Sequence, residues 1–192
     1  MKKRLYLVRH GQTMFNRQHR IQGWCDSPLT EVGKRQAKAV KEYFEEHGIS
    51  FDHAYCSTSE RCGDTLELIT DMPYTRTKEL KEMFYGELEA ESERLGTRDP
   101  RECETYYLRF GGESSNAVRD RMISALREIM ERNDHHSVLA VSHGGASFNF
   151  LRGIGADMRT YADGITNCCV FVLEYEDGKF HLTDCIPNPV KG

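Results

Sequence analysis

Two histidines that directly follow apolar runs are the residues of this chain best placed to carry out chemistry. The segment LYLVRHG, residues 5–11, runs from four apolar residues into Arg9 and His10, and SVLAVSHGG, residues 137–145, runs into His143. Both runs are typical of buried strands, and ligands of an open parallel sheet bind beyond the carboxyl ends of its strands. Each histidine precedes a glycine, which lets backbone amides approach a bound anion closely. We therefore expect His10 and His143 to open into one crevice.

A further cation is expected at the same edge of the sheet. The segment FDHAYCS, residues 51–57, predicts another strand, and Arg61 falls in the first turn of the helix expected after it. A helix N-terminus beside an arginine combines amide donors, the helix dipole and a bidentate guanidinium, which together suit a phosphate. Each of these residues alone is more simply a structural histidine or a solvated arginine. Two arginines and two histidines at three strand ends, however, predict a pocket for a phosphoryl group.

The pairing of histidine with arginine predicts a particular reaction. Nearby positive charge disfavours the protonated imidazole, so we expect His10 to be a neutral nucleophile near neutral pH. Phosphoryl transfer passes through a loose, anionic transition state, and its catalysis is mostly positioning and charge stabilisation. Attack by imidazole, while guanidinium groups hold the phosphoryl oxygens, would divide one difficult hydrolysis into two easier steps.

Alternating strands and helices are expected to position these residues. The apolar periodicity predicts strands at 4–8, 51–57, 74–80 and 137–142, a terminal hairpin of 168–175 and 179–185, and helices at 30–47, 58–70, 114–133 and from 144 onward. Residues 11–29 are expected to form a long polar loop, and residues 81–111 a small irregular excursion over the active site. The alternation predicts an α/β fold: a three-layer, doubly wound, mostly parallel sheet with helices on both faces.

Composition limits the class of protein. The 192 residues fit one domain, and the net charge of −4 argues against a general binder of nucleic acid or of anionic membranes. Seven cysteines show no CxxC pair and no zinc-ligand spacing, which favours reduced core thiols in a cytoplasmic protein. The first apolar run is too short for a signal peptide, and no run approaches the roughly 20 residues of a membrane span. We expect a monomer or homodimer whose partner is a small phosphorylated molecule.

Five segments of the sequence form a longer ordered pattern. They are LVRHGQTMFNRQHRIQGWCDSPLTEVGKRQA (7–37), CSTSERCGDTLELI (56–69), LKEMFYGELE (80–89), GGESSNAVRDR (111–121) and VSHGG (141–145). Along nearly its whole length the chain thereby resembles the histidine phosphatase (phosphoglycerate mutase-like) superfamily. The Arg-His-Gly tripeptide alone is a weak match, whereas the ordered set is highly specific. The resemblance implies a single domain over 1–192, with 81–111 as a cap-like excursion within it.

The resemblance implies a role for each matching position. His10 is implied to be the nucleophile that becomes phosphorylated, and Glu82 the proton donor to the leaving oxygen and later the base for water. The implied catalytic residues are His10, Glu82, His143, Arg9 and Arg61, and the implied phosphate-binding residues are Arg9, Asn16, Gln22, Gly23, Arg61, His143 and Gly144. Arg20 matches a position at the mouth of the pocket. The acidic neighbours Glu87 and Glu89 remain fallback candidates for the role of Glu82.

Three functions remain open: a phosphatase, a cofactor-dependent phosphoglycerate mutase and a non-catalytic binder of a phosphorylated ligand. Mutases of the family look longer, with an extra segment that closes over the acid and excludes water. Only residues 83–111 lie between Glu82 and the GES helix here, so we favour the phosphatase. The binder is disfavoured because every catalytic position is filled. No metal or other cofactor is expected, since the arginines supply the positive charge that a metal would.

The substrate is left open by the sequence. Arginines and tyrosines of the excursion either touch the rest of the substrate or form a solvated surface: Arg94, Arg98, Arg101, Arg109, Tyr85, Tyr106 and Tyr107. Leu88 and Ala90 stand where many phosphatases of the family have tryptophan and glycine, which alters the expected shape of the substrate mouth. Sugar phosphates, phosphoglycerates, nucleotides and cofactor-precursor phosphates are all compatible.

Overall fold

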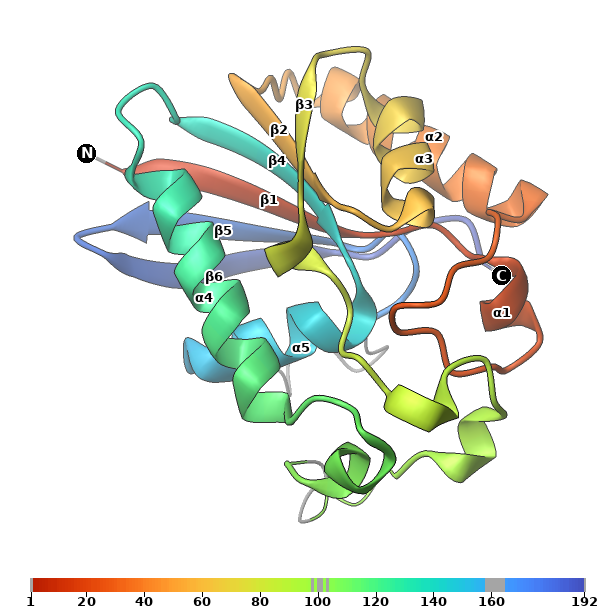
Figure 1. Ribbon diagram of the computed structural model, residues 1–192. Coiled ribbons are helices and arrows are strands. Elements are labelled where there is room, and N and C mark those ends of the chain that lie inside the picture. Colours follow the sequence, from red (N-terminus) through yellow and green to blue (C-terminus); the bar gives the residue numbers. More distant parts are fainter. Residues whose placement is uncertain (1, 98, 100–101, 103, 158–164, 192) are drawn as a thin grey trace.

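A six-stranded sheet forms the centre of the computed structural model (Figure 1), which describes residues 2–97, 99, 102, 104–157 and 165–191. The strands are β1 (Lys3–Arg9), β2 (His53–Ser57), β3 (Tyr74–Thr77), β4 (Ser137–Ser142), β5 (Val170–Glu176) and β6 (Lys179–Ile186). They lie in the order β3-β2-β4-β1-β5-β6. The strands from β3 to β1 are parallel, while β5 runs antiparallel to its neighbours β1 and β6. The mostly parallel sheet and the terminal hairpin predicted from the sequence are confirmed.

The register of the parallel strands brings their carboxyl ends to one edge of the sheet. Arg9 of β1 pairs with Ser142 of β4, and β2 pairs with the other side of β4. His10 therefore follows β1 at the level at which His143 follows β4. The centroids of the two imidazole rings lie 5.3 Å apart. The two histidines are thus neighbours at this edge, but only His10 lines the cavity there, so the expectation that both open into one crevice holds for His10 and not for His143.

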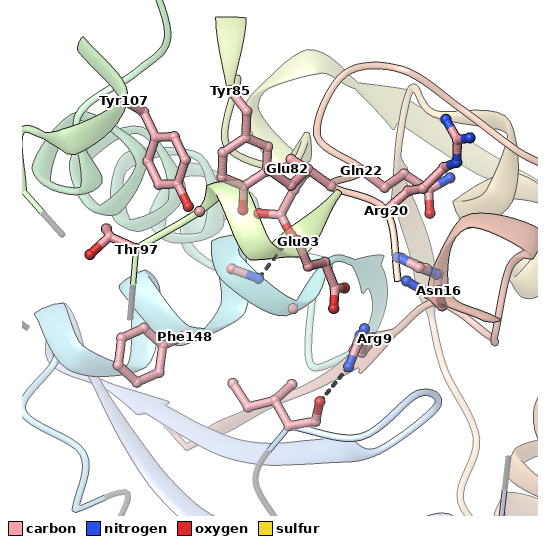
Figure 2. A pocket seen from close by; sticks show the side chains of 16 residues that line it. Arg9, Asn16, Arg20, Gln22, Glu82, Tyr85, Glu93, Thr97, Tyr107 and Phe148 are labelled. Atoms are coloured by element: carbon pink, nitrogen blue, oxygen red, sulfur yellow. Dashed lines mark hydrogen bonds between the residues drawn. The ribbon is translucent and has the colours of Figure 1, made fainter. Parts of the chain in front are cut away.

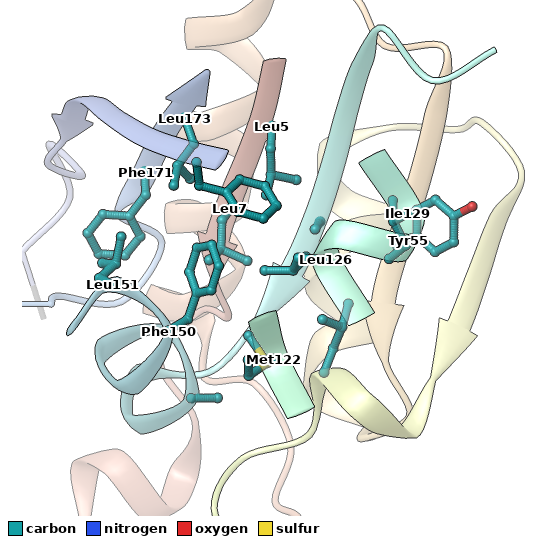
Figure 3. Packing of buried hydrophobic residues seen from close by; sticks show 14 of the residues in the cluster. Leu5, Leu7, Tyr55, Met122, Leu126, Ile129, Phe150, Leu151, Phe171 and Leu173 are labelled. Atoms are coloured by element: carbon teal, nitrogen blue, oxygen red, sulfur yellow. The ribbon is translucent and has the colours of Figure 1, made fainter. Parts of the chain in front are cut away.

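Helices cover both faces of the sheet because its central strands are apolar on both faces. The long helices are α2 (Glu31–Glu46), α3 (Glu60–Ile69), α4 (Ser115–Glu131) and α5 (Gly144–Gly153). Along β1, Leu5 and Leu7 pack against α4 and α5 (Figure 3), whereas Tyr6 and Val8 pack against α2 and α3. The chain therefore has the three-layer α/β architecture that its periodicity predicts.

Side-chain caps fix where two of these helices begin. The Thr30 hydroxyl accepts a hydrogen bond from the Gly33 amide at the start of α2, at 3.0 Å. The Ser114 hydroxyl accepts one from the Ala117 amide at the start of α4, at 3.1 Å. Such caps satisfy amides that have no partner within the helix. Both helix starts agree with the sequence-based prediction.

Two expected elements differ in the structure. The strand expected at 74–80 ends at Thr77, and Lys78–Leu80 form a 3₁₀ turn. The expected polar loop at 11–29 contains a short helix, α1 (Met14–Arg17). A four-residue helix is too short to show an apolar periodicity, which is why the sequence pattern does not reveal it.

The described residues of 81–111 form the predicted irregular excursion, with short 3₁₀ helices at Gly86–Leu88, Glu93–Leu95 and Tyr106–Phe110. Two backbone hydrogen bonds join it to the 11–29 loop: the Ile21 amide donates to the Glu91 carbonyl at 2.8 Å, and the Ala90 amide donates to the Ile21 carbonyl at 2.9 Å. Excursion and loop together form one wall in front of the carboxyl edge of the sheet.

No helix within the described residues is long and apolar enough to span a membrane. Six of the seven cysteines lie in the described part of the chain, where all six are free thiols. Four of them, Cys56, Cys62, Cys168 and Cys169, are buried. They pack as small core side chains, as the sequence predicts. Cys103 lies outside the described residues.

Candidate active site

His10 follows β1 and has the geometry of a neutral nucleophile. Its side chain is buried, and Nδ1 lies 2.8 Å from the carbonyl oxygen of Gly11. Because a carbonyl can only accept a hydrogen bond, Nδ1 carries the proton and the lone pair of the neutral ring lies on Nε2. Burial, and then the positive charges of Arg61 and Arg9, lower the pKa of His10 well below its ordinary value. The ring is therefore uncharged at neutral pH.

His143 and Arg61 form a wholly buried layer against His10. Arg61 Nη2 donates to Nδ1 of His143 at 2.8 Å, which leaves the imidazole proton on Nε2, 2.8 Å from the hydroxyl oxygen of Ser57. Burial, followed by the charge of Arg61, lowers the pKa of His143 well below its ordinary value. The layer thus combines a neutral imidazole with a fixed guanidinium.

The guanidinium of Arg61 is held by acceptors from two sides. Nη1 donates to the Cys25 carbonyl and to the Asp26 carboxylate, both at 2.9 Å, and Nη2 also donates to the Gly23 carbonyl at 2.8 Å. Its Nε is buried and has no hydrogen-bond partner in the part of the chain that the structure describes. Leaving a buried donor unpaired costs about 1–3 kcal/mol, and more for a charged group. Arg61 therefore keeps one buried donor unpaired directly behind the cavity wall.

Arg9 offers a second donor of the same kind. Its Nη1 donates to the carbonyl of Ile165, while its Nε is buried and has no hydrogen-bond partner among the described residues. This Nε lies against the first turn of α5, because a Cβ placed on Gly144 would be 3.2 Å from it. The N-terminus of α5 adds amide donors and the positive end of the helix dipole. The edge of the sheet beside His10 is thus built to hold an anion.

A cavity of about 470 Å³ opens in front of His10 (Figure 2). Seven of the residues predicted from the sequence line it: Arg9, His10, Asn16, Arg20, Gln22, Glu82 and Gly144. Three others, Arg61, His143 and Gly23, are not part of its wall. They lie one layer deeper because Arg61 binds both His143 and the Gly23 carbonyl. The sequence predicted a single hollow, and the structure divides the set into a wall and a supporting layer.

Two amides of the 11–29 loop reach the cavity. The side-chain oxygen of Asn16 accepts a hydrogen bond from the Thr13 amide at 3.1 Å, which leaves the Asn16 NH2 group to face the cavity. Gln22 is held in place by two hydroxyl groups of the same loop. Arg20 is exposed at the mouth, where its Nη1 donates to the Ala90 carbonyl at 2.9 Å.

Glu82 brings a buried carboxyl group to the wall opposite Arg9 (Figure 2). One oxygen accepts a hydrogen bond from the Gly145 amide and the other from the Met83 amide, both at 2.8 Å. A Cβ on Gly145 would lie 2.7 Å from the carboxyl group, so only glycine allows this approach. Glu82 is therefore oriented by the backbone on both sides.

The two fallback carboxylates lie elsewhere. Glu89 accepts hydrogen bonds from four backbone amides, those of Gly23, Trp24, Cys25 and Tyr85. With both oxygens occupied, Glu89 anchors the 11–29 loop to the excursion rather than facing the cavity. Glu87 is exposed on the surface. Neither lines the cavity, so their candidacy for the acid role is not supported by their positions.

An ion pair that the sequence did not indicate supports Glu82 from behind. Arg121 of α4 donates to three carbonyl groups between positions 79 and 82, including that of Glu82 at 2.9 Å. It also binds both carboxylate oxygens of Glu113, each at 3.0 Å. Glu113 in turn accepts a hydrogen bond from the Phe84 amide at 2.8 Å. This pair, which we name the Glu113–Arg121 clamp, fixes the backbone on both sides of Glu82.

The aromatic and cationic residues of the excursion divide into two groups. Tyr85 and Tyr107, whose ring centroids lie 4.7 Å apart, line the cavity. Tyr106 and Arg109 stack on each other outside it, with the Arg109 guanidinium carbon 4.1 Å from the Tyr106 ring centroid. Arg94 is exposed and does not line the cavity. Arg98 and Arg101 lie outside the described residues.

Glu93, Thr97 and Phe148 line the cavity as well, although the sequence singled out none of them. Figure 2 shows the Glu93 carboxylate between Glu82 and Arg9. No spacing rule links these three residues to His10, because two come from the irregular excursion and one from an exposed position of α5.

Comparison with known proteins identifies the family of the chain. Residues 5–186 match the model of the histidine phosphatase superfamily (branch 1). The chain is 31% identical over 182 residues to the uncharacterized phosphatase PhoE of Bacillus subtilis, covering 93% of this chain and 91% of that protein. It is 31% identical over 194 residues to a metal-independent phosphoserine phosphatase of Arabidopsis thaliana, covering 92% and 78%.

Mutase-like relatives and solved structures match over similar lengths. A probable phosphoglycerate mutase GpmB of Salmonella newport is 32% identical over 189 residues, covering 92% of this chain and 86% of that protein. The solved structure of YhfR from Bacillus stearothermophilus superposes with a TM-score of 0.80 at 28% identity, covering 93% of this chain and 94% of that one. The chain therefore belongs to the histidine phosphatase superfamily.

Proposed function

We propose that the chain is a phosphatase that hydrolyses a small-molecule phosphomonoester through a phosphohistidine at His10. The observation that carries the proposal is the neutral His10 ring, with its lone pair on Nε2, beside a cavity with Glu82 on its far wall. Two buried guanidinium donors that lack partners among the described residues, Nε of Arg9 and Nε of Arg61, lie at the same edge. Membership in a family that includes phosphatases supports the same reaction.

In the first step, Nε2 of His10 attacks phosphorus and the bond from phosphorus to the ester oxygen breaks. The carboxyl group of Glu82 donates its proton to the leaving oxygen, which departs as an alcohol. Arg9, Asn16 and the N-terminus of α5 stabilise the phosphoryl oxygens. The hydrogen bond from Nδ1 to the Gly11 carbonyl stabilises the positive charge that develops on the imidazole.

In the second step, the Glu82 carboxylate takes a proton from water while the water oxygen attacks phosphorus. The phosphorus–nitrogen bond breaks, inorganic phosphate leaves and the lone pair returns to Nε2 of His10. The same carboxyl group is thus acid and then base, and both protonation states are restored after one turnover.

Metal independence is part of the proposal. The positive charge that a metal would bring to the phosphoryl oxygens is supplied by Arg9, with Arg61 behind it. A relative named as a metal-independent phosphoserine phosphatase supports this assignment.

The mutase is the second candidate, because a probable phosphoglycerate mutase is among the relatives. A mutase must keep water away from the phosphohistidine until a second acceptor takes the phosphoryl group. Here Phe148, 47% exposed, and the exposed Arg20 line the cavity, so its mouth is in contact with solvent. Access of water favours hydrolysis over transfer.

Phosphate release from a panel of phosphomonoesters, run beside a mutase assay with phosphoglycerates, tests the proposal. We expect hydrolysis to exceed transfer, and His10→Ala to abolish both. Labelled substrate, quenched in alkaline denaturant because the phosphorus–nitrogen bond is labile in acid, should label the native protein but not the variant. Transfer faster than release would favour the mutase. Turnover by His10→Ala would reject the phosphohistidine.

A further inference from the structure

A second cluster of histidine and carboxylate side chains lies at the opposite edge of the sheet from His10. His53 is the first residue of β2, and Asp134 and His135 lie between the end of α4 and the start of β4. The geometry points to a binding site for one divalent first-row transition metal ion, of which zinc is the representative, formed by His53, Asp134 and His135. This site plays no part in the proposed phosphatase reaction.

The three side chains already converge. Nε2 of His53 lies 3.0 Å from one oxygen of Asp134, and Nδ1 of His135 lies 2.8 Å from the other. One ligand atom from each residue lies within 4.8 Å of the other two. Two imidazoles and a carboxylate are a donor set that zinc accepts, with bonds of about 2.0–2.2 Å. Water would complete a tetrahedral site on the exposed side.

Binding requires a small adjustment of two side chains. The imidazoles of His53 and His135 are stacked, with ring centroids 3.7 Å apart and planes inclined by 11°, so one ring must tilt before both lone pairs meet at one ion. His53 can move because its side chain is 35% exposed, and Asp134 can move because its side chain is 70% exposed. The buried His135 stays fixed as the foundation of the site.

The ring nitrogen of His135 that would face away from the metal already has a hydrogen-bond partner. This nitrogen, Nε2, lies 2.7 Å from the hydroxyl oxygen of Tyr55, which also accepts a hydrogen bond from Arg132 at 3.2 Å. Without metal, the Asp134 carboxylate can only accept, so Nδ1 of His135 carries the proton and the Tyr55 hydroxyl donates to Nε2. A metal ion on Nδ1 displaces that proton to solvent, and the neutral ring then takes the tautomer with its proton on Nε2, facing Tyr55. Metal-bound histidines characteristically donate their other ring N–H to such a partner.

Zinc binding measured on the intact, chelator-treated protein tests the site. Equilibrium dialysis against zinc chloride should give one ion per chain, and zinc should raise the melting temperature because it binds the folded state. His53→Gln and Asp134→Asn change partly exposed residues, so both variants should fold, and each should weaken binding by at least about 10-fold. The matched control is His181→Gln, which changes an exposed histidine on β6.

Two results would overturn the site. The first is zinc binding that is undetectable, or that is unchanged in His53→Gln and Asp134→Asn. The second comes from cobalt(II) in place of zinc: a thiolate-to-metal charge-transfer band would place the ion on cysteines. Phosphatase activity is expected to be the same with and without zinc, so failure of this site and failure of the phosphatase proposal would be separate outcomes.

Discussion

At the level of single residues, one hydrogen bond decides which nitrogen of His10 can react. The bond from Nδ1 to the Gly11 carbonyl leaves the lone pair on Nε2, the atom that attacks in the proposed reaction, and burial is the main cause of the lowered pKa of the ring. The sequence predicted the neutral ring from the neighbouring arginines. Burial is the larger cause in the structure, and it could not be deduced from charge spacing alone.

The lowered pKa of His10 predicts the acid side of the pH profile. Only the neutral ring attacks phosphorus, and its pKa lies well below 6.5, so kcat/KM should not fall at pH 6.5 through protonation of His10. Arg9→Gln removes one repelling charge, so the protonated ring becomes more favourable and the acid limb moves to higher pH. The pH profiles of kcat/KM are measured for both proteins with the same substrate. The titration of the substrate phosphate is then the same in both profiles and does not affect the difference between them. A limb that stays in place, or moves to lower pH, would contradict the assignment.

Glu82→Gln tests the acid role through the leaving group. An alkyl leaving oxygen needs a proton, so kcat/KM for alkyl phosphates should fall by about 100- to 10,000-fold. An activated aryl ester leaves without that proton and should lose far less. Because kcat/KM reports the steps up to phosphorylation of His10, the later role of Glu82 as a base does not enter. Glu87→Gln, at an exposed acidic position, is the matched control. Equal losses for both ester classes would remove Glu82 from the acid role.

At the level of elements, periodicity predicted the long helices and the buried strands well. The apolar run at 137–142 is strand β4, and the Thr30 and Ser114 caps begin helices. What escaped prediction is set by contacts between distant segments. The Glu113–Arg121 clamp, for example, joins α4 to carbonyl groups about 40 residues earlier in the chain, and no local pattern encodes such a contact.

The clamp makes its own prediction. Without Arg121, the carbonyls of Glu79, Lys81 and Glu82 lose its three hydrogen bonds, and only Glu82 keeps another donor among the described residues, the Trp24 indole. We expect the carboxyl group to shift, and misplacement by about 1 Å can cost up to roughly 100-fold. Arg121→Gln should therefore slow alkyl phosphates more than activated aryl esters, as Glu82→Gln does, and Arg121→Lys should restore part of the difference. Arg127→Gln, on an exposed position of the same helix, should leave the ratio of the two rates unchanged. A loss that is equal for both esters would show only a structural role.

At the level of the whole molecule, the sheet separates two kinds of chemistry at its two edges. The carboxyl ends of the strands carry the proposed phosphoryl site, and the amino end of β2 carries the proposed metal site. A chelator should therefore lower the melting temperature of zinc-loaded protein while leaving kcat unchanged. Thermal melting and phosphate release on the same EDTA-treated sample measure both. Loss of activity with EDTA, restored by zinc, would contradict the metal-independent mechanism.

The sequence predicted which residues gather at this edge of the sheet, but not which of them line the cavity and which lie behind it. It brought Arg61 and His143 to the correct edge of the sheet, yet both lie in the supporting layer because their polar groups bind each other. Motif spacing predicts the strand end at which a residue lies. The direction in which its side chain points depends on hydrogen-bond partners, such as Asp26 for Arg61 and Ser57 for His143.

The backbone pairing between Ile21 and the excursion has a consequence for how such proteins diversify. The side chains that would contact the departing alcohol lie largely on the 11–29 loop and the excursion. The proposed nucleophile, His10, instead directly follows a strand of the sheet. Substitutions in these two segments can therefore change which phosphate ester binds without changing the residues that would react. Because backbone hydrogen bonds join the two segments, the backbone sets the width of the opening and the side chains set its selectivity.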